Sequence, residues 1–210
     1  MNGRGATRLI LVRHGETVWT GEHRYQGVTD TALTTKGKRQ ARALAAFLRR
    51  QQVDVLITSS LRRAKETGKV ISQAIHRRPR NIAQLDEISF GCWEGKTSEE
   101  LLRMKDHVFF KWCKGKFVTP PGGESPRAAW RRIAMALRVI LKRHKGKTVA
   151  MVSHGGPIKM IISIALDWPL RSLGSIRIDP ASFSILDFYP HFTQCHSLNN
   201  TSHLVRNMSQ

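Results

Sequence analysis

Three short segments of the sequence place basic side chains, histidine, serine or glycine directly after an apolar run. They are Arg13–Gly15 (RHG), Ser59–Arg63 (SSLRR) and Ser153–Gly156 (SHGG). Together they supply two histidines and at least two arginines, and the fixed fork of a guanidinium group matches the oxygens of a phosphoryl group. The three segments therefore predict a site for a phosphate ester.

His14 is the candidate nucleophile of this site. One nitrogen of its imidazole can attack phosphorus if a hydrogen bond holds the other nitrogen and the ring is neutral. The neighbouring Gly15 has no side chain, and we expect it to leave room for a bulky phosphorus centre.

A proton donor is also needed, and the stretch LDEISFGCWEG carries three acids in a basic chain: Asp86, Glu87 and Glu94. A carboxyl group that protonates the departing alkoxide and then activates water would serve both half-reactions, a role worth about 10²–10⁴ in rate. Chemistry alone does not rank the three acids.

Strands and helices must bring these segments together. Apolar runs rich in Val, Ile and Leu predict buried parallel strands, and apolar residues at helical spacing predict helices between them. Strands that alternate with helices indicate an α/β sheet, and ligands of such sheets bind at the carboxyl ends of the strands, where all three segments lie. The predicted strands are Leu9–Val12, Val53–Thr58 and Thr148–Val152, and the predicted helices are Thr35–Arg50, Arg62–His76, Ser125–His144 and Pro157–Leu166.

The length of 210 residues favours one domain, residues 1–210, with a core of about 7–205. Ser182–Tyr189 and the TSHLV segment, residues 201–205, are expected to add edge strands. Ser125 is a plausible N-cap ahead of Pro126, after a Gly/Pro-rich loop at 114–125. The last five residues, RNMSQ, are expected to fray.

The composition is that of a folded globular protein, with 40% hydrophobic and 24% charged residues, but 35 Lys and Arg face only 15 Asp and Glu. The net charge of +20 favours anionic partners. Because the cations are scattered over several segments with few aromatic residues among them, we expect a small phosphorylated metabolite rather than nucleic acid. No apolar run is long enough for a signal peptide or a membrane span, so we expect no contact with a membrane and a cytoplasmic location.

The three cysteines, Cys92, Cys113 and Cys195, are far apart and odd in number, which indicates neither a disulfide framework nor a zinc knuckle. A reducing compartment fits them. The segment HFTQCHSLNNTSH brings His191, Cys195, His196 and His203 within short range, but their spacing matches no known pattern of metal ligands, so a metal site there is disfavoured.

Together these motifs resemble the histidine phosphatase superfamily, the phosphoglycerate mutase-like group, over most of the chain from Leu9 to about Leu204. RHGET at 13–17 resembles its signature, and RYQGVTDTALTTKGKRQA resembles the segment that follows it. SSLRRAKET, LDEISFGCWEG, PGGES and SHGG resemble further family segments, in the family's order. The resemblance implies a three-layer α/β/α fold with a mostly parallel central sheet.

Carried over residue by residue, the resemblance implies that His14 becomes a transient phosphohistidine. Arg13, Arg63 and His154 would bind the phosphoryl oxygens, and Glu87 would be acid first and base second. No metal or other cofactor is implied. The resemblance favours Arg63 over Arg62, which we expect to face solvent, and Glu87 over Glu94, which we expect to hold a turn.

The candidate substrate contacts are Thr20, Gln26, Gly27 and Gly155. The family often has Asn three residues after the Thr of its signature, where it contacts phosphate, and this chain has Thr20 there. A hydroxyl offers one donor where the amide offers two.

The resemblance covers phosphatases and mutases, and the stretch after Glu87 is shorter than the insertion that mutases carry. We therefore expect water to reach the site and hydrolysis to prevail. RIDPASFSILDF and LNNTSHL resemble the alpha-ribazole phosphatase branch of cobalamin assembly, although these segments lie away from the chemistry. The alternatives are a broad-specificity or sugar-phosphate phosphatase, a cofactor-dependent phosphoglycerate mutase, and an inactive protein that binds anions or nucleic acid.

Overall fold

The structure, a computed structural model, describes residues 5–205, so the predicted fraying of residues 206–210 lies outside the described residues. A six-stranded sheet has the order β3-β2-β4-β1-β5-β6. The first four strands of this order are mutually parallel, whereas β5 runs antiparallel to β1 and β6 antiparallel to β5. The strands are β1 (Thr7–Arg13), β2 (Val55–Thr58), β3 (Arg80–Asn81), β4 (Thr148–Ser153), β5 (Phe183–Phe188) and β6 (Thr193–Asn200).

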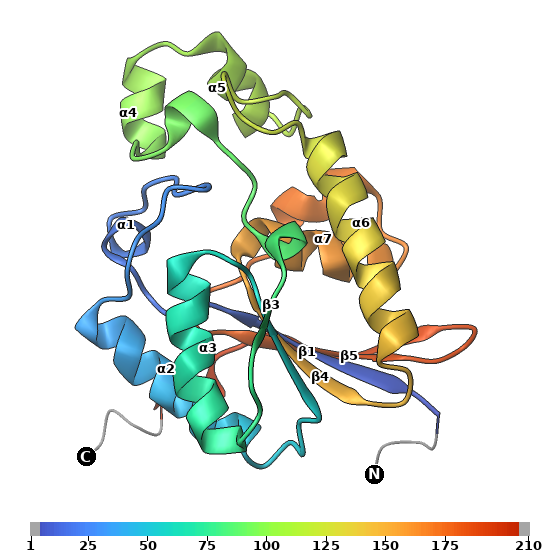
Figure 1. The fold of residues 1–210 in the computed structure, drawn as a ribbon. Coiled ribbons are helices and arrows are strands. Elements are labelled where there is room, and N and C mark those ends of the chain that lie inside the picture. The colour runs from blue at the N-terminus through green and yellow to red at the C-terminus, as the bar shows by residue number, and fades with distance from the viewer. Residues whose placement is uncertain (1–4, 206–210) are drawn as a thin grey trace.

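Helices cover both faces of this sheet, with α2 and α3 on one face and α6 and α7 on the other (Figure 1). The side chains of β1 alternate between the two layers, so that Leu9 and Leu11 pack on the α6–α7 side and Ile10 and Val12 on the α2–α3 side. The expected three-layer α/β/α architecture is therefore present. The four helices are α2 (Thr35–Leu48), α3 (Arg62–Ile75), α6 (Pro126–Arg143) and α7 (Gly155–Ala165).

The predicted helices, the three predicted parallel strands and the strand at 182–189 are found with boundaries that differ by at most two residues. The edge position predicted for the last of these is wrong, because it is β5, which lies inside the sheet between β1 and β6. The start of α6 shows why the boundaries agree. Ser125 caps the helix, because its hydroxyl accepts from the backbone N–H of Ala128 (3.2 Å), and Pro126 occupies the first turn. The Gly/Pro-rich loop before it, residues 114–125, contains no helix or strand.

The strand predicted at residues 201–205 is wrong. Ser202–Val205 form the helical turn α8, which begins where the Asn200 side chain accepts from the backbone N–H (2.9 Å) and the hydroxyl (2.8 Å) of Ser202. The final strand lies just before it, at β6, whose sequence TQCHSLNN is too polar for an apolar pattern to reveal. Five residues of mixed polarity do not distinguish a strand from one turn of helix.

Two short helices, α4 (Ser98–Arg103) and α5 (His107–Cys113), follow the acid-rich segment and lie at the top of Figure 1, away from the three layers. They have a small core of their own, formed by Trp93, Leu101 and Phe109. The indole N–H of Trp93 donates to Asp106 (2.9 Å). The remaining short elements are helix α1 (Val18–Gly21) and 3₁₀ turns at Ala83–Leu85, Gly91–Trp93 and Leu170–Ser175.

Candidate active site

His14 and His154 lie side by side at the carboxyl ends of adjacent strands. His14 follows β1, His154 follows β4, and the backbone N–H of His14 donates to the carbonyl of Ser153 (3.0 Å). Both side chains are buried, and their ring centroids are 5.1 Å apart. The parallel pairing of β1 with β4 thus joins two histidines that are distant in the sequence.

Arg63 connects the two histidines. It lies in the first turn of α3 and is fully buried. Its Nε lies 3.2 Å from both His14 Nε2 and His154 Nδ1, and its N–H donates to these two nitrogens. Its terminal nitrogens donate to the carbonyls of Gly27 (2.7 Å) and Thr29 (2.9 Å). These bonds fix the guanidinium plane between the histidines and the 27–29 loop.

The neighbouring Arg62 points elsewhere. Its side chain is 61% exposed and forms an ion pair with Glu66 one turn along α3 (2.8 Å). Of the two adjacent arginines, the structure brings only Arg63 to the histidines.

The hydrogen bonds of His14 assign its tautomer. Nδ1 lies 2.7 Å from the carbonyl oxygen of Gly15, which can only accept, so Nδ1 carries the hydrogen and Nε2 keeps a lone pair. Burial, and then the charges of Arg63 and Arg13, hold the pKa of His14 well below its usual value. The ring is therefore neutral near pH 7, which is the state that a nucleophile needs.

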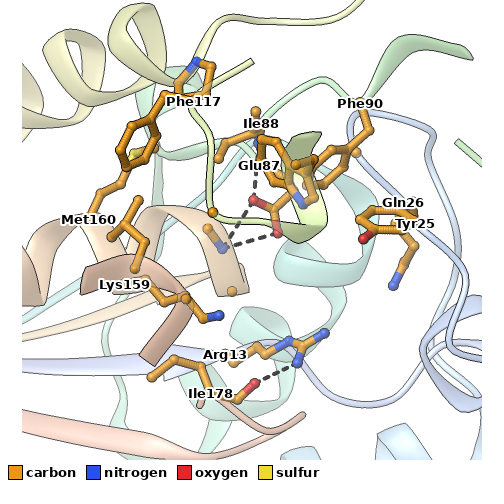
Figure 2. Close-up of a pocket in the computed structure, with 18 of the residues that line it drawn as sticks. Arg13, Tyr25, Gln26, Glu87, Ile88, Phe90, Phe117, Lys159, Met160 and Ile178 are labelled. Carbon is orange, nitrogen blue, oxygen red and sulfur yellow. Dashed lines mark hydrogen bonds between the residues drawn. The ribbon is translucent and has the colours of Figure 1, made fainter. Parts of the chain in front are cut away.

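Arg13 has an unused donor at the cavity. Its Nη1 donates to the carbonyl of Ile178 (2.6 Å), as Figure 2 shows. Its buried Nε–H finds no hydrogen-bond partner among residues 5–205. A buried donor without a partner costs free energy, and a phosphoryl oxygen is an acceptor that can complete it.

Of the three candidate acids, Glu87 lines the cavity. Its Oε1 accepts from the backbone N–H groups of Ile88 (3.0 Å) and Gly156 (3.2 Å), and these bonds hold the carboxyl group over the start of α7 (Figure 2). A Cβ atom at Gly156 would lie within 3.0 Å of Glu87 Oε1 and 2.8 Å from Ile88 Cδ1. The absence of a side chain at Gly156 therefore permits this close approach.

The other two acids stabilise neighbouring loops. Asp86 accepts from the backbone N–H of Ser60 (2.7 Å) and from the hydroxyls of Ser59 (2.7 Å) and Ser60 (2.5 Å). Glu94 joins the loop after Gly27 to the acid-rich segment, consistent with its expected role in holding a turn. It accepts from the backbone N–H groups of Val28, Thr29 and Phe90.

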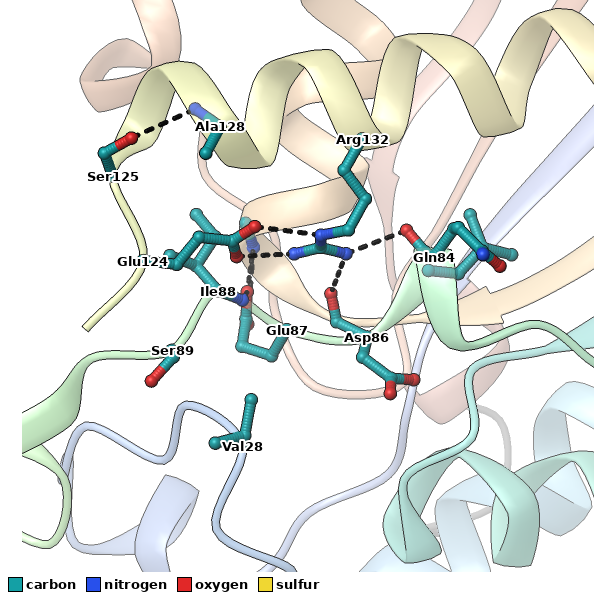
Figure 3. Close-up of polar contacts among 12 residues, drawn as sticks. Val28, Gln84, Asp86, Glu87, Ile88, Ser89, Glu124, Ser125, Ala128 and Arg132 are labelled. Atoms are coloured by element: carbon teal, nitrogen blue, oxygen red, sulfur yellow. Dashed lines mark hydrogen bonds and ion pairs between the residues drawn. The ribbon is translucent and has the colours of Figure 1, made fainter. Parts of the chain in front are cut away.

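Helix α6 anchors the segment that carries Asp86 and Glu87 (Figure 3). Arg132 donates through Nη1 to the carbonyls of Gln84 (2.8 Å) and Asp86 (3.0 Å), and its other two nitrogens bind the carboxylate of Glu124 (2.9 and 2.7 Å). Nothing in the sequence pattern distinguished Arg132 from the other arginines of this helix.

The structure brings three of the four candidate substrate contacts to the cavity: Gln26, Gly27 and Gly155. Thr20 is not among the lining residues. Its hydroxyl donates to the carbonyl of Thr17 (2.9 Å) and accepts from the backbone N–H of Thr17 (2.8 Å), which makes it part of the capping box of α1. A role of Thr20 in phosphate binding therefore remains only a prediction.

The role predicted for Gly15 is wrong. A Cβ atom there would meet the carbonyl oxygen of Gly37 at 2.5 Å, so the missing side chain serves the packing of the loop after β1 against α2. The backbone N–H of Gly15 donates to the hydroxyl of Thr67 (3.1 Å). The open space beside His14 is that of the cavity that it lines.

The cavity has a volume of about 430 Å³ and extends well beyond His14, which lines it, whereas the buried His154 is not among its lining residues. Four aromatic side chains that sequence reasoning missed line it: Tyr25, Phe90, Trp112 and Phe117. Tyr25 and Phe90 meet edge to face with centroids 5.0 Å apart. These residues form an apolar wall around the space that a leaving group would fill.

Lys159 is a further lining residue that was missed. It is half-buried on α7, and Figure 2 shows its amino group pointing into the cavity between Arg13 and Glu87. Burial lowers the pKa of Lys159, while the charge of Glu87 acts in the opposite direction. Its position four residues after Gly155 places it on the same helix face, a spacing that could have identified it.

The histidines near the C-terminus do not assemble a metal site. His196 pairs with Asp187 (2.9 Å), and His203 lies against the stacked rings of Phe47 and Phe183. Within the part of the chain that the structure describes, no group of three or more His, Cys, Asp or Glu side chains could hold a metal ion.

Comparison with known proteins shows the family to which the chain belongs. Residues 9–201 match the family model of the histidine phosphatase superfamily (branch 1). The chain belongs to this superfamily. Its fold is that of the phosphoglycerate mutase-like members. A solved structure of phosphoserine phosphatase from Entamoeba histolytica superposes on it with a TM-score of 0.84 at 32% identity, over 94% of this chain and 99% of the other.

Two further relatives carry phosphatase names. Phosphoserine phosphatase 1 of Hydrogenobacter thermophilus is 34% identical over 198 residues, 94% of either chain. The structure of alpha-ribazole phosphatase from Shigella flexneri has a TM-score of 0.83 at 28% identity and covers 92% of this chain and 96% of its own. The chain also matches a bifunctional protein of Mycobacterium tuberculosis at 36% identity, but it spans only 50% of that protein.

One further finding concerns membranes. None of the helices in residues 5–205 combines the length and the apolar character needed to cross a bilayer.

Proposed function

We propose that the protein hydrolyses a small phosphate monoester through a phosphohistidine on His14. The observation that carries this proposal is the convergence of a neutral imidazole, whose Nε2 keeps its lone pair, with the Nε–H groups of Arg63 and Arg13 at one cavity. Membership of the histidine phosphatase superfamily supports the same chemistry.

In the proposed mechanism His14 Nε2 attacks phosphorus and displaces an alkoxide, which takes a proton from Glu87. Water then attacks the phosphohistidine, Glu87 takes a proton from that water, and inorganic phosphate leaves. Arg13, Arg63 and His154 bind the phosphoryl oxygens and stabilise the charge that develops on them. Because two guanidinium groups supply this positive charge, the proposed reaction requires no metal.

For the leaving group, the aromatic wall formed by Tyr25, Phe90, Trp112 and Phe117 supports a planar base. Alpha-ribazole phosphate has such a base, and relatives of this chain are named for it, which makes a step of cobalamin synthesis our first candidate. A second candidate is a phosphorylated hydroxy acid such as phosphoserine. Lys159 supports it, because an amino group in the cavity can bind a carboxylate.

Two exposed free thiols, Cys92 and Cys113, support a reducing compartment such as the cytoplasm as the place of this reaction.

The first experiment measures phosphate release from p-nitrophenyl phosphate, with EDTA present, by wild type and by His14→Ala. Turnover by wild type alone supports the histidine mechanism without metal, whereas equal activity of the two proteins contradicts it. If wild type is inactive, phosphoglycerates are tested for isomerisation without phosphate release, which would favour a mutase.

The second experiment compares kcat/KM for alpha-ribazole phosphate and phosphoserine in two variants. Phe117→Ala is expected to impair the first substrate more, and Lys159→Met the second. A variant that affects both substrates equally contradicts the recognition assigned to that side chain.

A further inference from the structure

A chain of hydrogen bonds leads from Asp86 to the second histidine. Asp86 Oδ1 lies 2.7 Å from Ser59 Oγ, and Ser59 Oγ lies 2.7 Å from His154 Nε2. Ser59 and His154 are fully buried. Asp86 was one of three candidate proton donors in the sequence, and the mechanism proposed above leaves it without a role.

The hydrogen bonds of Ser59 determine where the protons of His154 lie. Ser59 has one hydroxyl hydrogen, and it goes to Asp86 because a carboxylate only accepts. The hydroxyl oxygen then accepts from the backbone N–H of Leu61 (3.2 Å) and from His154 Nε2. His154 therefore carries its hydrogen on Nε2, and the lone pair of Nδ1 faces Arg63.

This tautomer does not suit a phosphoryl group, whose oxygens accept hydrogen bonds and would be repelled by the lone pair of Nδ1. For the phosphoryl binding proposed above, the Nε–H of Arg63 that now donates to Nδ1 has to move aside, and the ring has to gain a second proton at Nδ1. Burial, and then nearby positive charge, keep the pKa of His154 well below its usual value in the free protein. The groups that oppose this proton are Arg63 on α3, His14 just after β1, Arg13 on β1, and Arg132 on α6.

Resting on the proposed function, we propose that Asp86 acts through Ser59 as a positioning residue for His154. It fixes the hydrogen of His154 on Nε2. It also stabilises the imidazolium that forms when Nδ1 takes a proton from solvent on phosphoryl binding. The incoming dianion and the carboxylate of Asp86 then lie on opposite sides of the ring. Of the nearby acids, Glu87 is bound to Ile88 and Gly156 rather than to either histidine.

The two histidines differ in this respect. The Nδ1–H of His14 ends on a neutral backbone carbonyl, that of Gly15, whereas the Nε2–H of His154 leads to a carboxylate. Two buried imidazoles in one cationic site can thus hold different protonation states, one neutral as the nucleophile and one protonated as a cation.

Nitrogen-15 NMR of the histidine rings, with inorganic phosphate as the probe, tests the assignment. In the free protein His154 is expected to carry hydrogen on Nε2 only, and with phosphate bound on both nitrogens, while His14 stays neutral. Phosphate that binds without a proton on Nδ1 of His154 overturns the inference. Phosphate that does not bind at all counts against the proposed function itself.

The pH dependence of kcat tests the role of Asp86. With p-nitrophenyl phosphate the leaving nitrophenolate needs no proton, so Glu87 does not set the alkaline limit. The pKa that governs kcat is that of the enzyme–substrate complex. Loss of the nearby negative charge in Asp86→Asn is expected to lower this pKa, so the alkaline limit moves down by about one pH unit, and Ser59→Ala is expected to do the same.

Ser60→Ala is the matched control. It removes a hydrogen bond to the same carboxylate, at Oδ2, and leaves the link through Ser59 in place. Its alkaline limit is expected to match that of wild type. If Asp86→Asn lowers kcat equally at every pH, or if Ser60→Ala shifts the limit as far as Ser59→Ala does, Asp86 only stabilises the loop and the inference is wrong.

Discussion

Gly156→Ala is expected to disable Glu87, the proposed proton donor, while leaving His14, the proposed nucleophile, intact. The new Cβ atom would lie within 3.0 Å of Glu87 Oε1 and 2.8 Å from Ile88 Cδ1, whereas ordinary contacts begin at 3.4 Å. Because the start of α7 is packed on the sheet, the carboxyl group must move, by an amount on the order of 1 Å. A displacement of that size can cost about 10²-fold in rate, or about 2.7 kcal/mol in the barrier.

The assay compares kcat/KM for an alkyl phosphate, whose leaving group needs a proton, with that for p-nitrophenyl phosphate, whose leaving group does not. The ratio of the two values is expected to fall by about 10²-fold in Gly156→Ala, at the lower end of what a general acid contributes. Gly155→Ala is the matched control, because its Cβ atom would come no closer than 3.9 Å to Arg13 and 4.0 Å to Glu87. An unchanged ratio in Gly156→Ala would refute the role of Glu87 as proton donor.

Three further predictions concern stability, and urea denaturation checks each of them. The two site histidines are neutral when folded and can gain protons when unfolded, so the free energy of unfolding is expected to fall as the pH drops below about 6.5, and a rise on acidification would contradict this. Arg8→Met removes the guanidinium that binds the buried Asp187 carboxylate at 2.7 and 2.6 Å, and is expected to cost about 3 kcal/mol at pH 7, whereas an unchanged midpoint would show that the pair contributes nothing. Ile133→Ala, at a fully buried position of α6, is expected to cost about 2–5 kcal/mol, while Met135→Ala, 71% exposed on the same helix, is expected to stay within about 0.5 kcal/mol of wild type.

The parallel part of the sheet could be predicted from the sequence because its strands are buried on both faces. The run Leu9–Val12 is apolar at every position, since alternate residues enter different cores. Strand β6 gave no such signal, because an edge strand of Thr, Gln, Cys, His and Ser residues meets solvent along one face. Pattern reasoning detects burial, and it therefore misses elements held mainly by backbone hydrogen bonds.

The site was predictable where a residue follows directly from a strand end, as His14 and His154 do. It was not predictable where the reason for a residue is a contact across the fold. Position 15 has to be glycine because it packs against the backbone of Gly37, 22 residues further along the chain. Arg132 is needed because it donates to carbonyls of a separate loop. Lys159 and the aromatic wall belong to this second kind, because only the folded chain brings them to the cavity.

The position of Arg63 has a consequence for experiments on this site. Two imidazole lone pairs, on His14 Nε2 and His154 Nδ1, point at one N–H group. Zinc and copper bind imidazole nitrogens readily, and in this structure the N–H group of Arg63 occupies both of these nitrogens. A variant that shortens this side chain is expected to leave both imidazole nitrogens free to bind a metal ion. Its loss of activity therefore has to be measured with and without a chelator before it is attributed to phosphate binding.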